Sequence, residues 1–172
     1  DLALVVAADP CTAAGVYTHR RVCAAPVTLD RQRTPSADMR VLVANSGNAN
    51  ACTGDRGWRD ALRMSESAAR CCHAASDQTR VLSTGSIGEY LPLEKIEAGI
   101  TNAAERLGHN ETNLTEAARA ILTTDQHEKL ASRSVQLGNR CLEIVGFAKG
   151  AGMIGPHMAT MLAVILTDAP LR

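Results

Sequence analysis

The sequence predicts one domain of the α/β or α+β class. A chain of 172 residues suits a single domain of ordinary size, and its 45% hydrophobic content is enough to fill a core. Strand-like runs alternate along the chain with segments whose apolar residues recur at helical spacing. With one Trp, two Tyr and one Phe, the core must be built mainly from Ala, Val, Leu, Ile and Met.

Strands are predicted where short runs of β-branched and apolar residues end at turn residues. The first run precedes the turn signal DPCT, the second follows it, and a further apolar segment comes before a polar loop. The predicted strands and this apolar segment cover residues 2–7, 13–18, 22–29, 40–44 and 79–83. Residues 134–148 predict a β-hairpin, because Gly138-Asn139 is a favourable two-residue turn.

Helices are predicted from helical periodicity and from helix-start residues. Residues 60–75 consist of good helix formers with apolar positions near a 3.6-residue period. Pro92 predicts the start of a second helix through Ala104, because proline is tolerated in the first turn. Two more helices are predicted, over residues 115–122 and from Pro156 onward.

The charge balance argues against some classes of partner. The chain has 18 basic and 18 acidic residues, and the basic residues are not clustered, which argues against binding to nucleic acid or to an anionic membrane. The longest apolar run, residues 158–166, is too short to cross a bilayer, and no leader pattern opens the chain. We therefore expect a soluble, cytoplasmic protein.

The cysteines show neither the density of a secreted disulfide scaffold nor a paired CxxC spacing. We expect buried, reduced thiols rather than a zinc site, and predict no metal. The six are Cys11, Cys23, Cys52, Cys71, Cys72 and Cys141.

The glycines near the end of the chain have two interpretations. Gly150, Gly152 and Gly155 match GxGxxG, which in a dinucleotide-binding fold follows a strand and opens a helix. Little chain follows to complete such a unit, and no acidic residue stands about 20 positions on to hold a ribose. The favoured interpretation is a tight turn with close backbone approach.

Several polar residues at predicted strand or helix ends are also candidates with two interpretations. Thr84 and Gly85 can supply a hydroxyl and a backbone N–H to a developing oxyanion, or can form a polar turn. The amide-rich run at 45–50 can form Asx turns, or can direct N–H groups at an anionic substrate. Residues 123–125 favour a turn after a helix, and Lys149 can bind a carboxylate or be solvated.

Thr160 is the sharpest candidate. If the peptide bond before it were cut, its new α-amine, with a pKa near 8, would be a usable base beside its own hydroxyl. Alternatively, Thr160 lies in a helix and bonds to the carbonyl four residues back. The sequence offers no convincing Ser-His-Asp or Cys-His set as another nucleophile.

Five segments, in the same order, make the sequence resemble the bifunctional ornithine acetyltransferase (glutamate N-acetyltransferase) family of the cyclic arginine pathway. They are AAGVYTHRRVCAAPV, NSGNANACTG, STGSIGEYLPLEKI, AILTTDQHEK and GFAKGAGMIGPHMATML. The resemblance implies a layered α/β sandwich of mixed sheets with outer helices, similar in layering to other self-processing, N-terminal-nucleophile enzymes. It also implies a precursor that cuts itself into an α chain and a β chain.

Site residues follow from the same resemblance. The cut lies between Ala159 and Thr160, and Thr160 becomes the nucleophile that carries acetyl from N-acetylornithine to glutamate in a ping-pong cycle. Thr84 and Gly85 resemble the oxyanion hole, and Thr123 and Lys149 resemble substrate-binding residues. No cofactor or metal is implied, and acetyl-CoA is a donor only in members that also start the pathway.

Residues 1–172 are accordingly expected to form one domain, with an α-chain region at 1–159 and the start of a β chain at 160–172. The remainder of the β chain is absent, so we expect this chain to be inactive alone, and its expected assembly is a heterotetramer of two α and two β chains. Gln126-His127-Glu128 departs from the family's usual Thr-x-Pro before Lys129. Two rival functions are a related N-terminal-nucleophile amidase or peptidase and a non-catalytic small-molecule binding domain.

Overall fold

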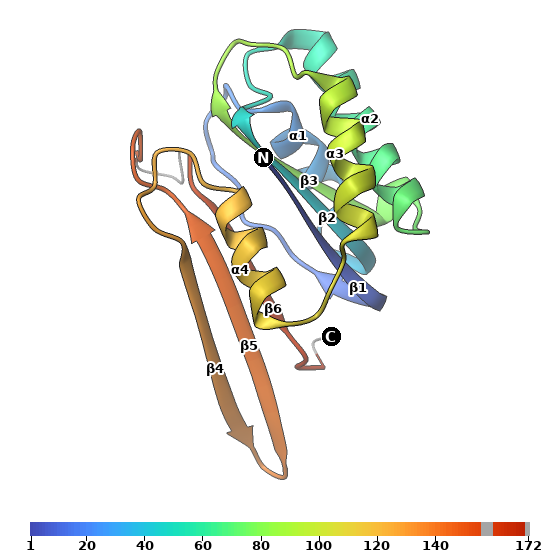
Figure 1. The fold of residues 1–172 in the computed structure, drawn as a ribbon, viewed down its shortest axis with the longest axis vertical. Helices are drawn as coiled ribbons and strands as arrows, with labels where there is room; N and C mark the ends of the chain where they lie inside the picture. The colour runs from blue at the N-terminus through green and yellow to red at the C-terminus, as the bar shows by residue number, and fades with distance from the viewer. Residues whose placement is uncertain (156–159, 171–172) are drawn as a thin grey trace.

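The computed structural model describes residues 1–155 and 160–170, and within them the chain forms two three-stranded sheets with helices around them (Figure 1). The first sheet contains β1 (Leu2–Ala13), β2 (Ser36–Asn48) and β3 (Thr79–Ser86) in that order. β1 runs antiparallel to β2, whereas β2 and β3 are parallel. The first sheet is therefore mixed, as the family resemblance implied.

Three helices, two between these strands and one after β3, pack on one face of the first sheet. They are α1 (Ala25–Gln32), α2 (Gly54–Cys71) and α3 (Leu93–Glu105), with a short 3-10 turn, η1 (Ser76–Gln78), before β3. Val41, Val43 and Val81 from the sheet pack against Met64 of α2 and Ile100 of α3 in one buried cluster. Removing this apolar surface from water is the main force that holds the helices on the sheet.

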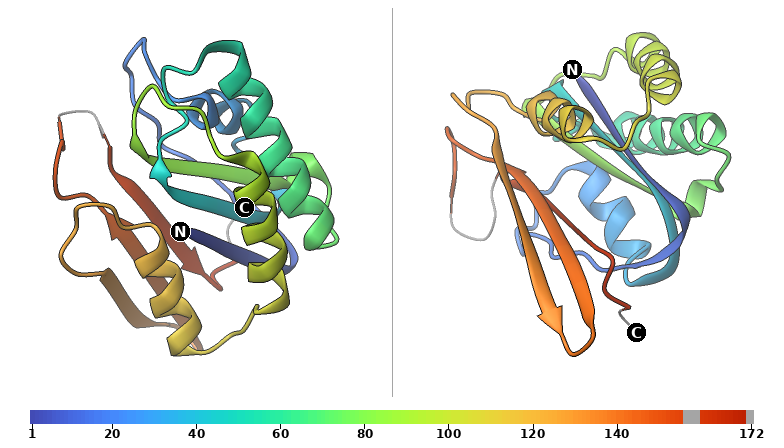
Figure 2. Two further views of the ribbon diagram at one scale, coloured as in Figure 1. Left: turned by 45° about the horizontal axis from the view of Figure 1, so that its top comes forward. Right: turned by 60° about the horizontal axis from the view of Figure 1, so that its bottom comes forward.

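The opposite face of the first sheet is covered by α4 (Glu111–Ala120) and the second sheet. The second sheet is an antiparallel meander of β4 (Lys129–Leu137), β5 (Arg140–Lys149) and β6 (Leu162–Thr167). Ala44 of β2 packs here with Ala118 of α4, Phe147 of β5 and Val164 of β6. Figure 2 shows the resulting layers, with the second sheet on the far side of the first from α2 and α3.

The layered arrangement of one mixed and one antiparallel sheet with outer helices confirms the predicted fold class. Five predicted elements are also confirmed in type, with shifted ends. The helices at 60–75 and 92–104 correspond to α2 and α3, and the strands at 2–7, 40–44 and 79–83 correspond to β1, β2 and β3. The predicted helix at 115–122 begins earlier, because the Asn110 side chain accepts the Asn113 N–H at 2.9 Å and caps α4. The hairpin is confirmed, with Gly138 at φ +60° in its turn.

Two predictions near the N-terminus are wrong. β1 continues through DPCT to Ala13 instead of turning there, and residues 14–18 form no strand. Because β1 lies at the edge of its sheet, Pro10 is tolerated at a register irregularity between Val6 and Cys11. The apolar segment at 22–29, grouped with the strands, contains the start of helix α1, whose Pro26 occupies the first turn.

The predicted helix from Pro156 onward is also wrong where it can be compared. Residues 156–159 lie outside the described part of the chain, and Leu162–Thr167 form strand β6. A short apolar run does not distinguish a buried strand from a helix by periodicity, and pairing with β5 decides the outcome here.

The cysteines are all free, but only Cys72 is buried. Cys11, Cys52 and Cys141 are exposed, so the expectation of buried thiols is wrong for these three. Within residues 1–155 and 160–170, no three His, Cys, Asp or Glu side chains gather closely enough to hold a metal ion. No helix in that part of the chain has the length and apolar character needed to span a membrane.

Candidate active site

Parallel pairing brings the ends of β2 and β3 to the same edge of the first sheet. Ser46 lies beside Thr84, and Gly47 lies beside Gly85. Gly85 has φ +133°, and a Cβ atom built on it would lie 2.1 Å from the carbonyl oxygen of Gly47. Only glycine fits at this position, because any side chain would collide with backbone that cannot move independently. Residues 45–48 therefore fix the position of residues 83–85.

Lys149 joins three separate parts of the chain at this edge. It ends β5, it is 3% exposed, and its Nζ donates hydrogen bonds to Thr84 Oγ1 at 3.1 Å and to Thr123 Oγ1 at 2.7 Å. The structure therefore brings together three of the predicted site residues. The alternative that Lys149 is a solvated cation is wrong.

Two hydrogen-bond donors of this cluster, on Lys149 and Thr84, are available to a ligand. An ammonium group has three N–H donors, and the two bonds to threonines leave one for a ligand. Because Thr84 Oγ1 accepts from Lys149, the Thr84 hydroxyl hydrogen is left to be donated elsewhere. Burial lowers the pKa of Lys149, an effect that the charge of Asp125 opposes and the charge of Lys129 reinforces.

The loop after α4 holds the glycine segment that follows Lys149. Asp125 Oδ1 accepts the Gly150 N–H at 2.7 Å, and Thr124 Oγ1 accepts the Gly152 N–H at 3.2 Å. A Cβ on Gly152 would lie 3.0 Å from Thr124 Oγ1, which supports the close-approach interpretation of these glycines. Since strand β6 follows instead of a helix, the segment does not form a dinucleotide-binding turn.

Thr160 lies just before β6, in a turn with φ +57°. This left-handed conformation is unusual for a β-branched residue, and such backbone strain is concentrated at functional sites. Its Oγ1 donates to the carbonyl oxygen of Met153 at 2.6 Å, so the predicted alternative of a helical bond four residues back is wrong. Because Lys149 pairs with Leu162, Thr160 lies two residues before the position of β6 that is paired with Lys149. Ala159, the other predicted residue of the cut bond, lies outside the described residues.

The amide-rich run at 45–50 serves mainly its own loop. Asn45 Nδ2 donates to the Asn48 carbonyl oxygen at 2.9 Å, and Asn50 Nδ2 donates to the Gly57 carbonyl oxygen at 2.7 Å. Ser83 Oγ also donates to the Asn48 carbonyl oxygen at 2.9 Å, which ties this loop to β3. The local interpretation of these amides is therefore favoured over direct anion binding.

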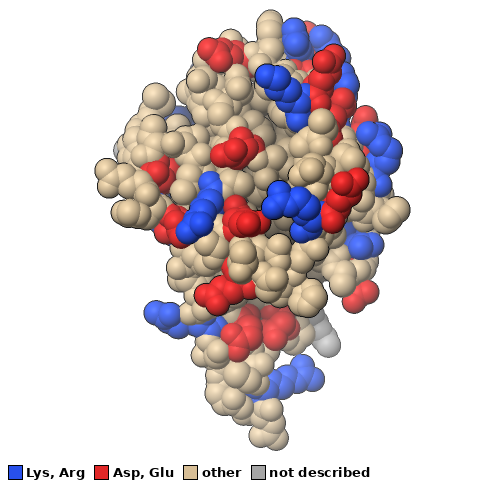
Figure 3. Space-filling view, viewed as in Figure 1, with Lys and Arg blue, Asp and Glu red and all other residues tan. Residues whose placement is uncertain are grey.

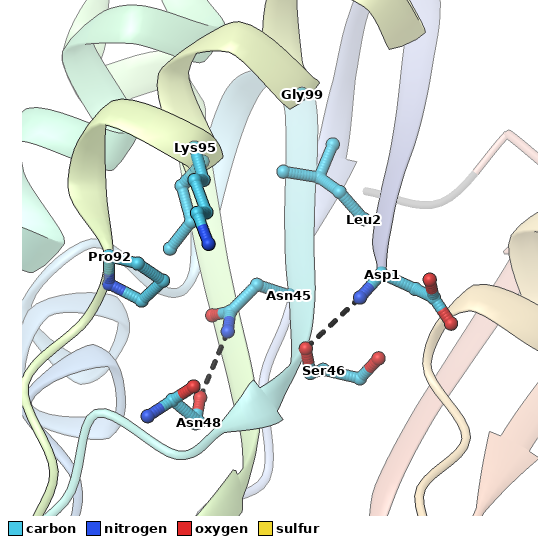
Figure 4. Close-up of a pocket in the computed structure, with 9 residues that line it drawn as sticks. Asp1, Leu2, Asn45, Ser46, Asn48, Pro92, Lys95 and Gly99 are labelled. Atoms are coloured by element: carbon cyan, nitrogen blue, oxygen red, sulfur yellow. Dashed lines mark hydrogen bonds between the residues drawn. The ribbon is translucent and has the colours of Figure 1, made fainter.

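A hollow of about 300 Å³ lies beside this loop, between β2 and the start of α3 (Figure 4). Asn45, Asn48 and Lys95 face it, and Asn45 Oδ1 is buried without a hydrogen-bond partner among the described residues. None of the predicted site residues lines this hollow. On the face shown in Figure 3, acidic and basic side chains are interspersed rather than gathered into one patch.

Sequence reasoning considered Asp125 only as part of a turn, and it did not consider Lys129 as part of the site. Residues 123–125 do form a turn after a helix, as predicted, but Asp125 also accepts the Gly150 N–H and contacts Lys129 Nζ at 2.6 Å. The only signal in the sequence was an acidic residue four positions before a lysine, next to two threonines. That pattern is common at exposed turns, so it does not reveal a buried carboxylate.

Comparison with known proteins gives a consistent family assignment. The sequence matches the ArgJ family over residues 1–172. It is 48% identical over 171 residues to an arginine biosynthesis bifunctional protein ArgJ from Rhodopirellula baltica, and 48% identical over 169 residues to one from Geobacter sulfurreducens. These matches cover 99% and 98% of the chain, but the chain spans only 42% of the length of either relative.

Solved structures share the fold. An arginine biosynthesis bifunctional protein ArgJ from Bacillus halodurans superposes with a TM-score of 0.85 at 36% identity, covering 92% of this chain and 83% of that one. An ornithine acetyltransferase from Mycobacterium tuberculosis, solved in complex with ornithine, gives a TM-score of 0.81 at 35% identity and covers 92% and 84%.

Proposed function

Because the chain belongs to the ArgJ family, we propose that it is the N-terminal, α-chain part of an acetyltransferase that moves acetyl from N-acetylornithine to glutamate. The observation that carries the proposal is the hydrogen-bonded cluster of Thr123 with the buried residues Lys149 and Thr84, close in the chain to Met153, whose carbonyl oxygen accepts the Thr160 hydroxyl. The names of the relatives support arginine biosynthesis, and the relative solved with ornithine supports the substrate class.

Self-cleavage is the first step of the proposed mechanism. The Thr160 hydroxyl attacks the carbonyl carbon of Ala159, and the peptide nitrogen leaves as an amine, so that an ester replaces the peptide bond. Water then hydrolyses the ester, which releases the Ala159 carboxylate and restores the hydroxyl. Thr160 is left with a free α-amine beside its own nucleophile.

The share of each relative that this chain covers is consistent with such a cut. The same chain covers 83% and 84% of the chains in the solved structures, but 42% of the full-length curated relatives. A precursor divided into two chains of similar length gives this difference. We therefore propose a β chain as the partner, a heterotetramer of two α and two β chains as the assembly, and inactivity of residues 1–172 alone.

Acetyl transfer follows in two steps. The Thr160 hydroxyl attacks the acetyl carbonyl of N-acetylornithine while the α-amine takes its proton, and ornithine leaves with a proton on its nitrogen. The amine of glutamate then attacks the acetyl ester and regenerates the hydroxyl. No cofactor is needed, and acetyl-CoA can replace the first donor in a bifunctional member.

Each residue of the candidate site has a part in these steps. The Thr84 hydroxyl and the Gly85 N–H stabilise the oxyanion of each tetrahedral intermediate, a contribution of about 3 kcal/mol per donor. The unused N–H of Lys149 binds the α-carboxylate of the substrate, and Thr123 lies beside it. Both substrates carry an α-carboxylate, so one ammonium can serve both halves of the cycle.

The experiment that tests the proposal measures mass and transfer together. The full-length precursor, including the region that completes the length of the relatives, is purified and its intact mass measured under denaturing conditions. Two fragments that meet at Ala159 and Thr160, with a gain of one acetyl group on the Thr160 fragment after addition of N-acetylornithine, are expected. Transfer to water in place of glutamate would identify an amidase, and binding without cleavage or turnover would identify a binding domain.

A further inference from the structure

Asp125 lies where the loop after α4, the start of β4 and the end of β5 meet. Its side chain is 0% exposed, although its partner Lys129 is 50% exposed. Asp125 Oδ1 accepts both the Gly150 N–H at 2.7 Å and the Lys129 Nζ–H at 2.6 Å. A single oxygen therefore ties together three segments that surround the Lys149 cluster.

The second carboxylate oxygen has no such support. Asp125 Oδ2 is buried and has no hydrogen-bond partner among residues 1–155 and 160–170. A buried acceptor without a partner costs about 1–3 kcal/mol, so this carboxylate is not an efficient way to stabilise a turn. Unsatisfied buried groups of this kind call for a reason other than stability.

The charge of Asp125 supplies that reason. Burial would raise the pKa of its carboxyl, but hydrogen bonds from Lys129 and from the Gly150 N–H hold the pKa below its usual value, so Asp125 is ionised. Its negative charge favours the ionised form of Lys149, which burial disfavours. Lys129, the other charged group that acts on Lys149, has the opposite effect.

We propose that Asp125 is a positioning residue of the reaction centre: it anchors the backbone after β5 through the Gly150 N–H and keeps the Lys149 ammonium charged beside Thr84 and Thr123. The role rests on the proposed function, because Lys149 matters for transfer only if it binds the substrate carboxylate. Asp125 does not contact the reacting atoms and acts through Lys149 and the glycine turn.

The test uses Asp125→Asn in the full-length precursor, because asparagine has nearly the same shape and can still accept the Gly150 N–H. The matched control is Asp38→Asn, which alters an exposed aspartate of β2 that accepts one hydrogen bond from Ser36. The titration of the Lys149 side chain is followed by NMR, with its signal assigned by its loss in Lys149→Met. The pH profile of kcat/KM for acetyl transfer is measured on the same variants.

In Asp125→Asn we expect the Lys149 midpoint and the alkaline limb of kcat/KM to move to lower pH together, because the charge that favours the ammonium form is removed. Lys129→Met is expected to move both to higher pH, because it removes the opposing charge. If Asp125→Asn and Lys129→Met acted only by loosening the turn, the Lys149 midpoint would move in the same direction in both variants. Opposite shifts therefore indicate an effect of charge. Lys129→Met also keeps the test decisive if Asp125→Asn does not fold.

The proposal is overturned if the Lys149 midpoint in Asp125→Asn equals that of the wild type and of Asp38→Asn. It is also overturned if the wild type is active and the Lys149 midpoint moves in Asp125→Asn, but the kcat/KM profile of this variant equals that of the wild type. A wild type that shows no transfer refutes the proposed function separately, and the NMR titration then still tests whether Asp125 sets the charge of Lys149.

Discussion

Replacing Lys149 by methionine should separate catalysis from stability. Methionine has a similar length, so the change removes the charge and the hydrogen bonds to Thr84 and Thr123 with little change in volume. Each bond to a charged donor contributes about 1.5–3 kcal/mol. The cost of burying an ammonium, several kcal/mol, disappears at the same time. The two effects are of similar size, so the free energy of unfolding should change by less than about 2 kcal/mol.

In catalysis, no gain offsets the loss of the hydrogen bond from Lys149 to the substrate. Losing one charged hydrogen bond to the substrate carboxylate, about 1.5–3 kcal/mol, corresponds to a roughly 10- to 150-fold lower kcat/KM. If the bond is formed equally in the ground state and the transition state, the loss appears in KM.

The assay combines urea unfolding with steady-state acetyl transfer from N-acetylornithine to glutamate. Lys95→Met is the matched control, because Lys95 is an exposed lysine of α3 outside the cluster. A Lys149→Met enzyme with the KM and kcat of the control would refute the role of Lys149. A large loss of stability would refute the energetic argument.

Three further predictions concern other residues. Thr160→Ala should abolish both self-cleavage and transfer, while Thr160→Ser retains part of each; intact-mass measurement decides this, and a cleaved Ala variant would exclude the mechanism. Gly85→Ala should destabilise the fold by at least about 2 kcal/mol, because its Cβ would lie 2.1 Å from the Gly47 carbonyl oxygen; an unchanged urea midpoint would contradict this geometry. Burial raises the pKa of Asp30 to about 7, although the hydrogen bond from the Val81 N–H opposes this rise. Between the usual pKa of an aspartate and this raised value, the Asp30 carboxyl keeps its proton in the folded state and loses it in the unfolded state. Stability from this group should therefore fall as pH rises from about 4 to 7, by at most about 4 kcal/mol, and Asp30→Asn should remove this dependence in unfolding measured at pH 5 and pH 8; equal slopes in both proteins would contradict it.

Local patterns in the sequence were sufficient for elements that depend on local chemistry. The helical period of residues 60–75 predicted α2, and Gly138-Asn139 predicted the turn between β4 and β5. Such signals are reliable because backbone propensity, turn geometry and the apolar face favour the same structure. They were insufficient for Leu162–Thr167, where an apolar run could form a helix or a strand and pairing with β5 decided between them.

The candidate site shows the same division. The sequence by itself provided the residue types and the family resemblance that singled out Thr84, Thr123, Lys149 and Thr160. Only the tertiary structure decided that Lys149 is buried against two threonines, which lie 65 and 26 positions away in the chain. Likewise, only the neighbouring strand explains why residue 85 must be glycine, since the Gly47 carbonyl occupies the space of a side chain. Contacts between distant segments and the burial of charge depend on how the two sheets pack together, and no local pattern encodes that packing.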